Sequence, residues 1–323
     1  MKDFAGRIAV ITGGGSGMGR ELARQLAAEG CNVALSDVSA GGMAETKRLC
    51  EAGGLRQGQR VTTHLADVAD EPQVIRFRDE VAQQQDTDRI HLLFNNAGIG
   101  GGSSFIVNGR EEWERTFNIC WNGVYLCTRA FLPMMQRADA GHIVNTSSVN
   151  GFWAFIAPNI PQTAYAAAKF AVKGFTEALI TDLRLNAPHI KCSVVMPGHI
   201  GTSIVRNSPR LQTGNQSDEI TPQEVALTRA RIASMGVDAS KLTDSEVRQM
   251  MADRARRFLA EAPTSAAEAA KIILDGVRAE RWRILVGRDA ERLDALVRET
   301  PEQAYEADFF DRFVKETGWA VGR

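Results

Sequence analysis

Short apolar runs alternate with longer amphipathic stretches along most of the chain. Several runs are apolar at consecutive positions, which is typical of strands buried on both faces of a parallel sheet. Alternation of such strands with helical stretches predicts a doubly wound, seven-stranded parallel sheet in a three-layer α/β/α fold. The seven expected strands are Arg7–Thr12, Asn32–Asp37, Val61–Asp67, Ile90–Gly98, His142–Ser148, Lys191–Gly198 and Trp282–Gly287.

Two regions interrupt this alternation. Between Thr202 and Thr264 there is no strand signal, but Thr221 and Thr243 are each followed three residues later by Glu, which indicates capped helices. After Gly287 apolar residues recur at helical spacing, with Pro301 as a break. The length of 323 residues would allow two domains. The pattern instead predicts a single domain over 1–323, with an inserted helical lid at 203–263 and a C-terminal helical extension at 288–323.

Composition narrows the class of protein. Lys and Arg number 38 and Asp and Glu 39, a net charge of −1, so no partner is expected among nucleic acids or anionic membranes. The five cysteines form no C-x-x-C pair and the five histidines are scattered, which argues against disulfides, zinc or another metal. With no apolar leader and no membrane-length run, the expectation is a cytoplasmic protein.

A glycine-rich loop follows the first expected strand. Gly13, Gly17 and Gly19 end that strand and open a helix, with Ser16 and Met18 between them. Glycine allows a tight turn and lets backbone N–H groups approach a pyrophosphate at the positive end of a helix. The spacing differs from the general G-x-G-x-x-G pattern, but the strand–loop–helix setting favours a nucleotide site.

Asp37 ends the second expected strand, eighteen residues after Gly19. A carboxylate there can accept both hydroxyls of an adenosine ribose and would repel a 2′-phosphate. Positions 16 and 38 carry no basic residue, so NAD is favoured over NADP. The alternative is a turn or helix-capping Asp, because Ser39 and two glycines follow.

Tyr165 and Lys169 are four residues apart and would share one face of a helix. A nearby ammonium lowers the pKa of a tyrosine and makes it a usable base, although such a pair also arises by chance on surfaces. Upstream, Ser147 and Ser148 end a strand, where a hydroxyl can bind a carbonyl oxygen or simply cap a turn.

Together these residues resemble the short-chain dehydrogenase/reductase family. The resemblance implies a Rossmann-type fold and an NAD-preferring alcohol dehydrogenase or ketoreductase, which interconverts a secondary alcohol and a ketone by hydride transfer. The matching motifs, in family order, are Thr12-Gly-x-x-x-Gly17-x-Gly19, Asp67-Val68, Asn95-Asn96-Ala97-Gly98, Asn122, Ser147-Ser148 with Gly151, Tyr165-x-x-x-Lys169 and Pro197-Gly198-x-Ile200-x-Thr202.

The resemblance implies a catalytic role for four residues. Tyr165 would be the general acid and base, and Lys169 would lower its pKa and bind the nicotinamide ribose. Ser148, favoured over Ser147, would orient the reacting oxygen. Asn122 would hold a water of the proton relay.

The resemblance also implies a cofactor site. Asp67 and Val68 would contact adenine, Asn95 would steady the central strands beside it, and Ile200 and Thr202 would hold the carboxamide. The expected cofactor-site residues are Gly13, Ser16, Gly17, Met18, Gly19, Asp37, Asp67, Val68, Asn95, Ala97, Gly98, Tyr165, Lys169, Pro197, Gly198, Ile200 and Thr202.

The chain departs from the family pattern after the catalytic serine. Ser148 and Tyr165 are seventeen positions apart, which is wider than usual, and the extra residues are rich in aromatic side chains. Phe152, Trp153 and Phe155 are therefore expected to line a site for a bulky apolar or aromatic alcohol or ketone. The alternative is that these apolar residues pack the larger lid onto the core. Family members usually form dimers or tetramers, which implies a homodimer or homotetramer.

Two other functions stay open. A non-catalytic NAD-binding regulatory protein usually lacks the Tyr or the Lys, and both are present here. A sugar-nucleotide epimerase or dehydratase would suit the length, but its glycine spacing is normally G-x-x-G-x-x-G.

Overall fold

The structure is a computed structural model that describes residues 1–101, 104–106, 109–158, 160–215, 217, 219–319 and 321. Position 159 of the aromatic loop, positions 216 and 218 of the expected lid, and positions 320, 322 and 323 of the expected extension lie outside the described residues.

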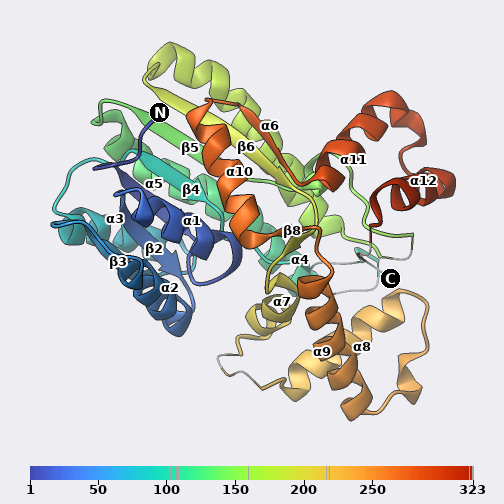
Figure 1. The fold of residues 1–323 in the computed structure, drawn as a ribbon. Coiled ribbons are helices and arrows are strands. Elements are labelled where there is room, and N and C mark those ends of the chain that lie inside the picture. Colours follow the sequence, from blue (N-terminus) through green and yellow to red (C-terminus); the bar gives the residue numbers. More distant parts are fainter. Residues whose placement is uncertain are drawn as a thin grey trace.

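Seven strands form one sheet in the order β3-β2-β1-β4-β5-β6-β9, and every neighbouring pair is parallel (Figure 1). All seven expected strands are confirmed, with ends that move by a few residues. The order reverses between β1 and β4, where ligands of such sheets bind beyond the carboxyl ends of the strands. The strands are β1 Ile8–Thr12, β2 Asn32–Asp37, β3 Val61–Leu65, β4 Leu92–Asn95, β5 Gly141–Thr146, β6 Ile190–Pro197 and β9 Arg283–Val286.

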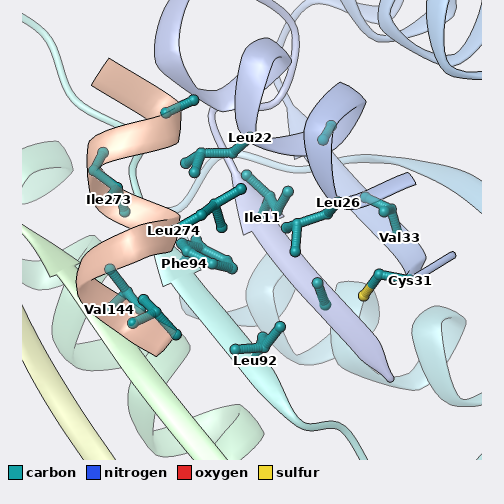
Figure 2. Packing of buried hydrophobic residues seen from close by; sticks show 14 of the residues in the cluster. Ile11, Leu22, Leu26, Cys31, Val33, Leu92, Phe94, Val144, Ile273 and Leu274 are labelled. Carbon is teal, nitrogen blue, oxygen red and sulfur yellow. The ribbon is translucent and has the colours of Figure 1, made fainter. Parts of the chain in front are cut away.

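Helices cover both faces of the sheet because its strands are apolar on both. In β1, Ile11 belongs to the core under α1, α2 and α10, whereas Val10 points to the opposite core under α3, α5 and α6. Figure 2 shows Leu22 of α1 and Leu274 of α10 packed on Ile11. These helices are α1 Gly17–Ala28, α2 Ala40–Ala52, α3 Glu71–Gln85, α5 Gly123–Gln136, α6 Thr163–Asn186 and α10 Ala266–Arg278, and α4 Arg110–Phe117 joins α5 through the π-helical turn Asn118–Asn122.

Three helices occupy the expected insertion: α7 Ile204–Thr213, α8 Pro222–Ser234 and α9 Asp244–Ala260. Thr221 and Thr243 form the predicted capping boxes at the starts of α8 and α9. The insertion begins and ends at a small parallel pair, β7 Ile200–Gly201 and β8 Thr264–Ser265. The sequence did not predict this pair, because two-residue strands carry no periodicity. We call α7–α9 the inserted helices.

The last helices extend the fold beyond the sheet. They are α11 Arg288–Glu299 and α12 Ala307–Thr317, with a single 3₁₀ turn from Pro301 to Gln303 between them, as the Pro301 break predicted. In Figure 1 they lie apart from α8 and α9. None of the helices in the described part of the chain is long and apolar enough to cross a membrane.

Candidate active site

The glycine loop is closed by contacts that exclude side chains. A Cβ on Gly19 would lie 2.1 Å from the carbonyl oxygen of Gly13, and Gly17 has a φ of +53°. Helix α1 begins at Gly17, and its N-cap Ser16 makes no side-chain bond to the first turn. The first N–H groups of α1 therefore stay open to an anion, so the loop fits a pyrophosphate group.

Asp37 stands beside this loop at the end of β2. Its carboxylate accepts hydrogen bonds from the backbone N–H groups of Gly15 and Ser39, both at 2.9 Å. Burial raises the pKa of Asp37, and these bonds and the charge of Arg20 oppose that shift. Positions 16 and 38 carry no basic residue, but Arg20 brings a positive charge beside the loop, where its guanidinium donates to the Gly15 carbonyl and to Thr46.

Tyr165 and Lys169 lie on one face of α6, as their spacing predicted. The Lys169 Nζ atom is 5.4 Å from the centre of the Tyr165 ring and donates a hydrogen bond to the Thr146 carbonyl at 2.9 Å. Burial raises the pKa of Tyr165 and lowers that of Lys169, so the surroundings favour the neutral form of each.

The two serines at the end of β5 have different partners. The Ser147 hydroxyl donates to the Lys169 carbonyl at 2.7 Å and ties the strand to α6. The Ser148 side chain lies close enough to Tyr165 to lower the tyrosine pKa against the effect of burial. The geometry thus brings Ser148, and not Ser147, to the tyrosine.

Asn122 is the last residue of the π-helical turn between α4 and α5. Its Nδ2 donates to Asn118 Oδ1 at 2.7 Å. Cys120 of the same turn packs in one cluster with Tyr165, and a Cβ on Gly98 would meet both Cys120 and Lys169, which places the turn beside these two residues. Turns of this kind are frequent at functional sites.

Thr12 and Asn96, which belong to two of the matching motifs, have a role that the sequence did not assign to them: they fix the strand ends. The Thr12 hydroxyl accepts hydrogen bonds from the backbone of Asn96 and Ala97, and Asn96 Nδ2 donates to the carbonyls of Thr12 and Gly13. Asn95 donates to Thr128 and Asn145, which steadies β4 against β5. The polar Thr and Asn at adjoining strand ends were the available signal.

The remaining expected cofactor residues surround this edge of the sheet. A Cβ on Gly98 would lie 3.5 Å from Lys169 Nζ, and the Thr202 side chain packs against Gly17. Asp67 forms an ion pair with Arg115 at 2.8 Å. The others are Val68, buried beside Gly123; Met18, packed on the core; and Pro197, Gly198 and Ile200 at or just beyond the end of β6.

A cavity of about 1090 Å³ opens on Ser148 and Tyr165 and continues between the inserted helices to Trp319. Phe152, Trp153 and Phe155, expected at the substrate, are not among its described lining residues. Their loop contributes Ile156, Ile160 and Pro161 instead.

The aromatic residues of this loop hold the C-terminal helices. Trp153 is fully buried, stacks among aromatic rings of α12, and donates its indole N–H to the Ala304 carbonyl at 2.6 Å. Phe155 packs on Trp153 and Phe310, and the Phe152 ring lies under the guanidinium of Arg283. No cluster of metal-ligating side chains occurs within the described residues.

The chain belongs to the short-chain dehydrogenase family, whose model matches residues 7–212. It is 35% identical over 299 residues to the "Putative oxidoreductase SadH" of Mycobacterium tuberculosis, with 92% of each chain covered. It is 36% identical over 229 residues to levodione reductase of Leifsonia aquatica, which covers 69% of this chain and 78% of that one. A short-chain dehydrogenase/reductase from Burkholderia phymatum in complex with NAD superposes with a TM-score of 0.75 at 30% identity, over 94% of this chain and 96% of the other.

Membership of this family defines an oxidoreductase of small molecules that acts on CH–OH groups with a nicotinamide cofactor. The family model ends within α7. Two of the helices that line the cavity, α8 and α9, follow it, so the family does not by itself specify the substrate.

Proposed function

We propose that the protein is an NAD-dependent dehydrogenase that interconverts a bulky secondary alcohol and its ketone. The observation that carries the proposal is the contact of Tyr165 with Ser148, beside Lys169, at the wall of a cavity large enough for substrate and nicotinamide. A regulatory protein would not need this arrangement. An epimerase is distinguished below by its lack of net NADH formation.

The residues at the strand ends fit a dinucleotide. The loop of Gly13, Ser16, Gly17, Met18 and Gly19 would hold the pyrophosphate at the start of α1. NAD, when bound, supplies the acceptor or donor of hydride. Asp37 would bind the adenosine ribose, and Asp67 and Val68 would contact the adenine. At the end of β4, Ala97 and Gly98 would line the cofactor and Asn95 would steady the strand. The nicotinamide would be held by Pro197, Gly198, Ile200 and Thr202.

The proton is moved by the chain's own side chains. In alcohol oxidation Tyr165 Oη takes the hydroxyl proton, and in ketone reduction it returns a proton to the same oxygen. Ser148 donates a hydrogen bond to that oxygen. Lys169 stabilises the tyrosinate and would bind the nicotinamide ribose, and Asn122 extends the relay to water.

Two finer assignments rest on single features. The preference for NAD rests on Asp37, because a carboxylate beside the glycine loop repels a 2′-phosphate. The bulky substrate rests on the apolar side chains that the inserted helices place along the cavity, which makes these helices the substrate lid. They include Ile204, Val205, Ile232, Met235 and Met251.

We also propose a homodimer or homotetramer that assembles through α5 and α6. Tyr125 and Phe170 are more than two-fifths exposed on these helices, and Trp121 of the adjoining turn packs on Phe175 of α6. A cytoplasmic location stays a prediction supported by the five unpaired cysteines.

Tyr165→Phe tests the central assignment. It should lower kcat/KM by about 10³-fold for any alcohol that the wild type oxidises, because the proton acceptor is lost. NADH should bind with unchanged Kd, as followed by its fluorescence. Near-normal turnover would refute the role of Tyr165, and an active wild type that forms no net NADH would favour the epimerase.

The pH profile tests the same role. Burial raises the pKa of Tyr165, so in the free protein the phenol stays protonated at neutral pH. Because oxidation needs the deprotonated form, kcat/KM should rise with pH and be lost as the pH falls through the pKa of the working tyrosine. A flat profile for oxidation, in the absence of a rate-limiting release step, would exclude Tyr165 as the base.

A further inference from the structure

Helix α9 carries Arg254 on a face that lines the cavity. Val247, Met251, Arg254 and Phe258 are four, three and four residues apart and so share a face. Val247 is fully buried, and Phe258 packs on His199 with ring centres 4.3 Å apart. Arg254 stands between Met251 and Phe258, and all three line the cavity that holds Tyr165 and Ser148.

Arg254 has no counter-ion within the described part of the chain. No hydrogen bond or ion pair of its guanidinium occurs there. Burial, together with the positive charges of Arg231 and Arg257, holds its pKa below the usual range. Arg254 is an exposed residue that also lines the cavity, which fits a side chain at the open wall of a hollow.

Several other charged groups of the cavity wall have partners, whereas Arg257, like Arg254, has no side-chain hydrogen bond or ion pair among the described residues. Arg231 is paired with Glu112 at 2.7 Å, and Arg256 with Asp253 of its own helix. Glu224 accepts hydrogen bonds from Thr221 and Asn215. Arg206 and Arg210 have contacts of their own. Of the lining carboxylates, Glu219, Glu224, Asp253 and Glu261, none contributes to the field at Arg254.

An arginine on a cavity wall with no carboxylate partner among the described residues is available to an anionic ligand. The guanidinium is planar and binds a carboxylate through two parallel hydrogen bonds. Apolar side chains of the inserted helices, among them Ile232, Met235 and Met251, line the same cavity as Tyr165 and Arg254. The cavity wall thus offers apolar surface, the Tyr165 hydroxyl and an arginine without a carboxylate partner in the part of the chain that the structure describes.

We propose that Arg254 binds a carboxylate of the substrate, which is therefore an amphipathic hydroxy acid or keto acid with an apolar body. This inference rests on the proposed function and deepens it, because it assigns the charge of the substrate and the residue that selects it. Arg254 is a specificity-determining residue and takes no part in the proton transfer.

The test compares acids with their esters. The probes are straight-chain hydroxy acids with the hydroxyl on the penultimate carbon, in a series of increasing length, each beside its methyl ester. The wild type should oxidise the acid of the fitting length with a kcat/KM about 10- to 100-fold above that of its ester. Arg254→Gln should remove this preference, mainly by raising KM for the acid, and leave the ester unaffected. Arg254→Lys should retain part of it.

Arg256→Gln is the matched control. It makes the same substitution two residues away on the same helix, at an arginine that already has a carboxylate partner. It should keep the wild-type preference. An equal or better kcat/KM for the esters at every length, or an equal loss for acid and ester in Arg254→Gln, would overturn the proposal.

Binding without turnover separates this inference from the proposed function. Isothermal titration with the same hydroxy acids should give a Kd that is raised about tenfold or more in Arg254→Gln and unchanged in Tyr165→Phe. If no alcohol is oxidised but this dependence on Arg254 remains, the proposed reaction fails and the carboxylate site stands. If esters are oxidised as well as acids, the reaction stands and the site fails.

Discussion

The two halves of the active site are built from different materials. At the strand ends the contacts are made by backbone and small side chains: Gly13 and Gly19 meet directly, and Thr12 receives two backbone N–H groups. At the inserted helices the cavity wall consists of long side chains, such as Arg254 and Met251, on helices that face solvent elsewhere. We call these the strand-end half and the helical half.

This difference separates chemistry from selection. In the strand-end half a single added methyl group would collide with the backbone, so the geometry of cofactor and tyrosine is held within narrow limits. In the helical half a side chain can be exchanged without moving the main chain. Substitutions in the strand-end half should lower turnover of every substrate alike. Substitutions in the helical half should change which substrate is accepted.

Trp153→Ala should have the largest effect on stability, because this residue joins the helical tail to the sheet. The side chain is fully buried against α12, and the cavity left behind should cost about 3–5 kcal/mol of unfolding free energy. Thermal melting and limited proteolysis of the last helices would measure it. Trp282→Ala is the control: that ring is 46% exposed, and its removal should cost about 0.5 kcal/mol. Equal losses would show that the tail does not depend on Trp153.

Gly19→Ala probes the strand-end half. The new Cβ would lie 2.1 Å from the Gly13 oxygen, so the loop must open. NADH should bind about 100-fold more weakly, equivalent to about 2.7 kcal/mol, as measured by fluorescence titration. In Gly41→Ala the new Cβ meets nothing within 4 Å in the first turn of α2. That variant should bind NADH normally and gain up to about 1 kcal/mol of stability. Wild-type binding by Gly19→Ala would contradict the proposed loop.

The strand-end half could be predicted from the sequence because its constraints are local. Continuous Val and Ile runs mark parallel strands, and parallel strands place their carboxyl ends at one edge. Gly19, Asp37 and Ser148 are brought to that edge simply by ending their strands or opening the next helix. The contact of Tyr165 with Ser148 follows from the start of α6 beside the end of β5.

The helical half could not be predicted to the same depth. Capping boxes at Thr221 and Thr243 give the helix starts, but no periodicity tells which face of a charged helix turns inward. Arg254 looks like one more arginine of a solvated surface until the structure places it beside Phe258. The aromatic loop was expected at the substrate for a related reason. A residue such as Trp153 indicates burial, but the sequence does not say which part of the fold it is buried against.

Asp37→Ala should change the cofactor preference with little effect on the chemistry. Removal of the carboxylate eliminates its repulsion of a 2′-phosphate and its bonds to the loop, so the ratio of Kd values for NADP and NAD should fall about tenfold. Asp70→Ala removes an Asp of the neighbouring β3–α3 connection, which caps α3 through the Gln73 N–H, and should leave the ratio unchanged. An unchanged ratio in Asp37→Ala would assign Asp37 to the turn alone.

Thr243→Ala should have the smallest effect on stability of the variants considered, and its effect should be limited to the helical half. The Thr243 side chain accepts the N–H of Glu246 at the start of α9, and loss of this cap should cost about 1 kcal/mol, or about 2 °C in the melting temperature. Ser203 is also an N-cap hydroxyl, at α7, but makes no side-chain bond there, so Ser203→Ala should leave the melting temperature unchanged. Because Thr243 holds the helix that carries Arg254, its loss should raise KM for the preferred substrate while NADH binding stays as in the wild type. Weaker NADH binding in Thr243→Ala would show that the two halves are coupled and that the division between chemistry and selection is less sharp than their construction implies.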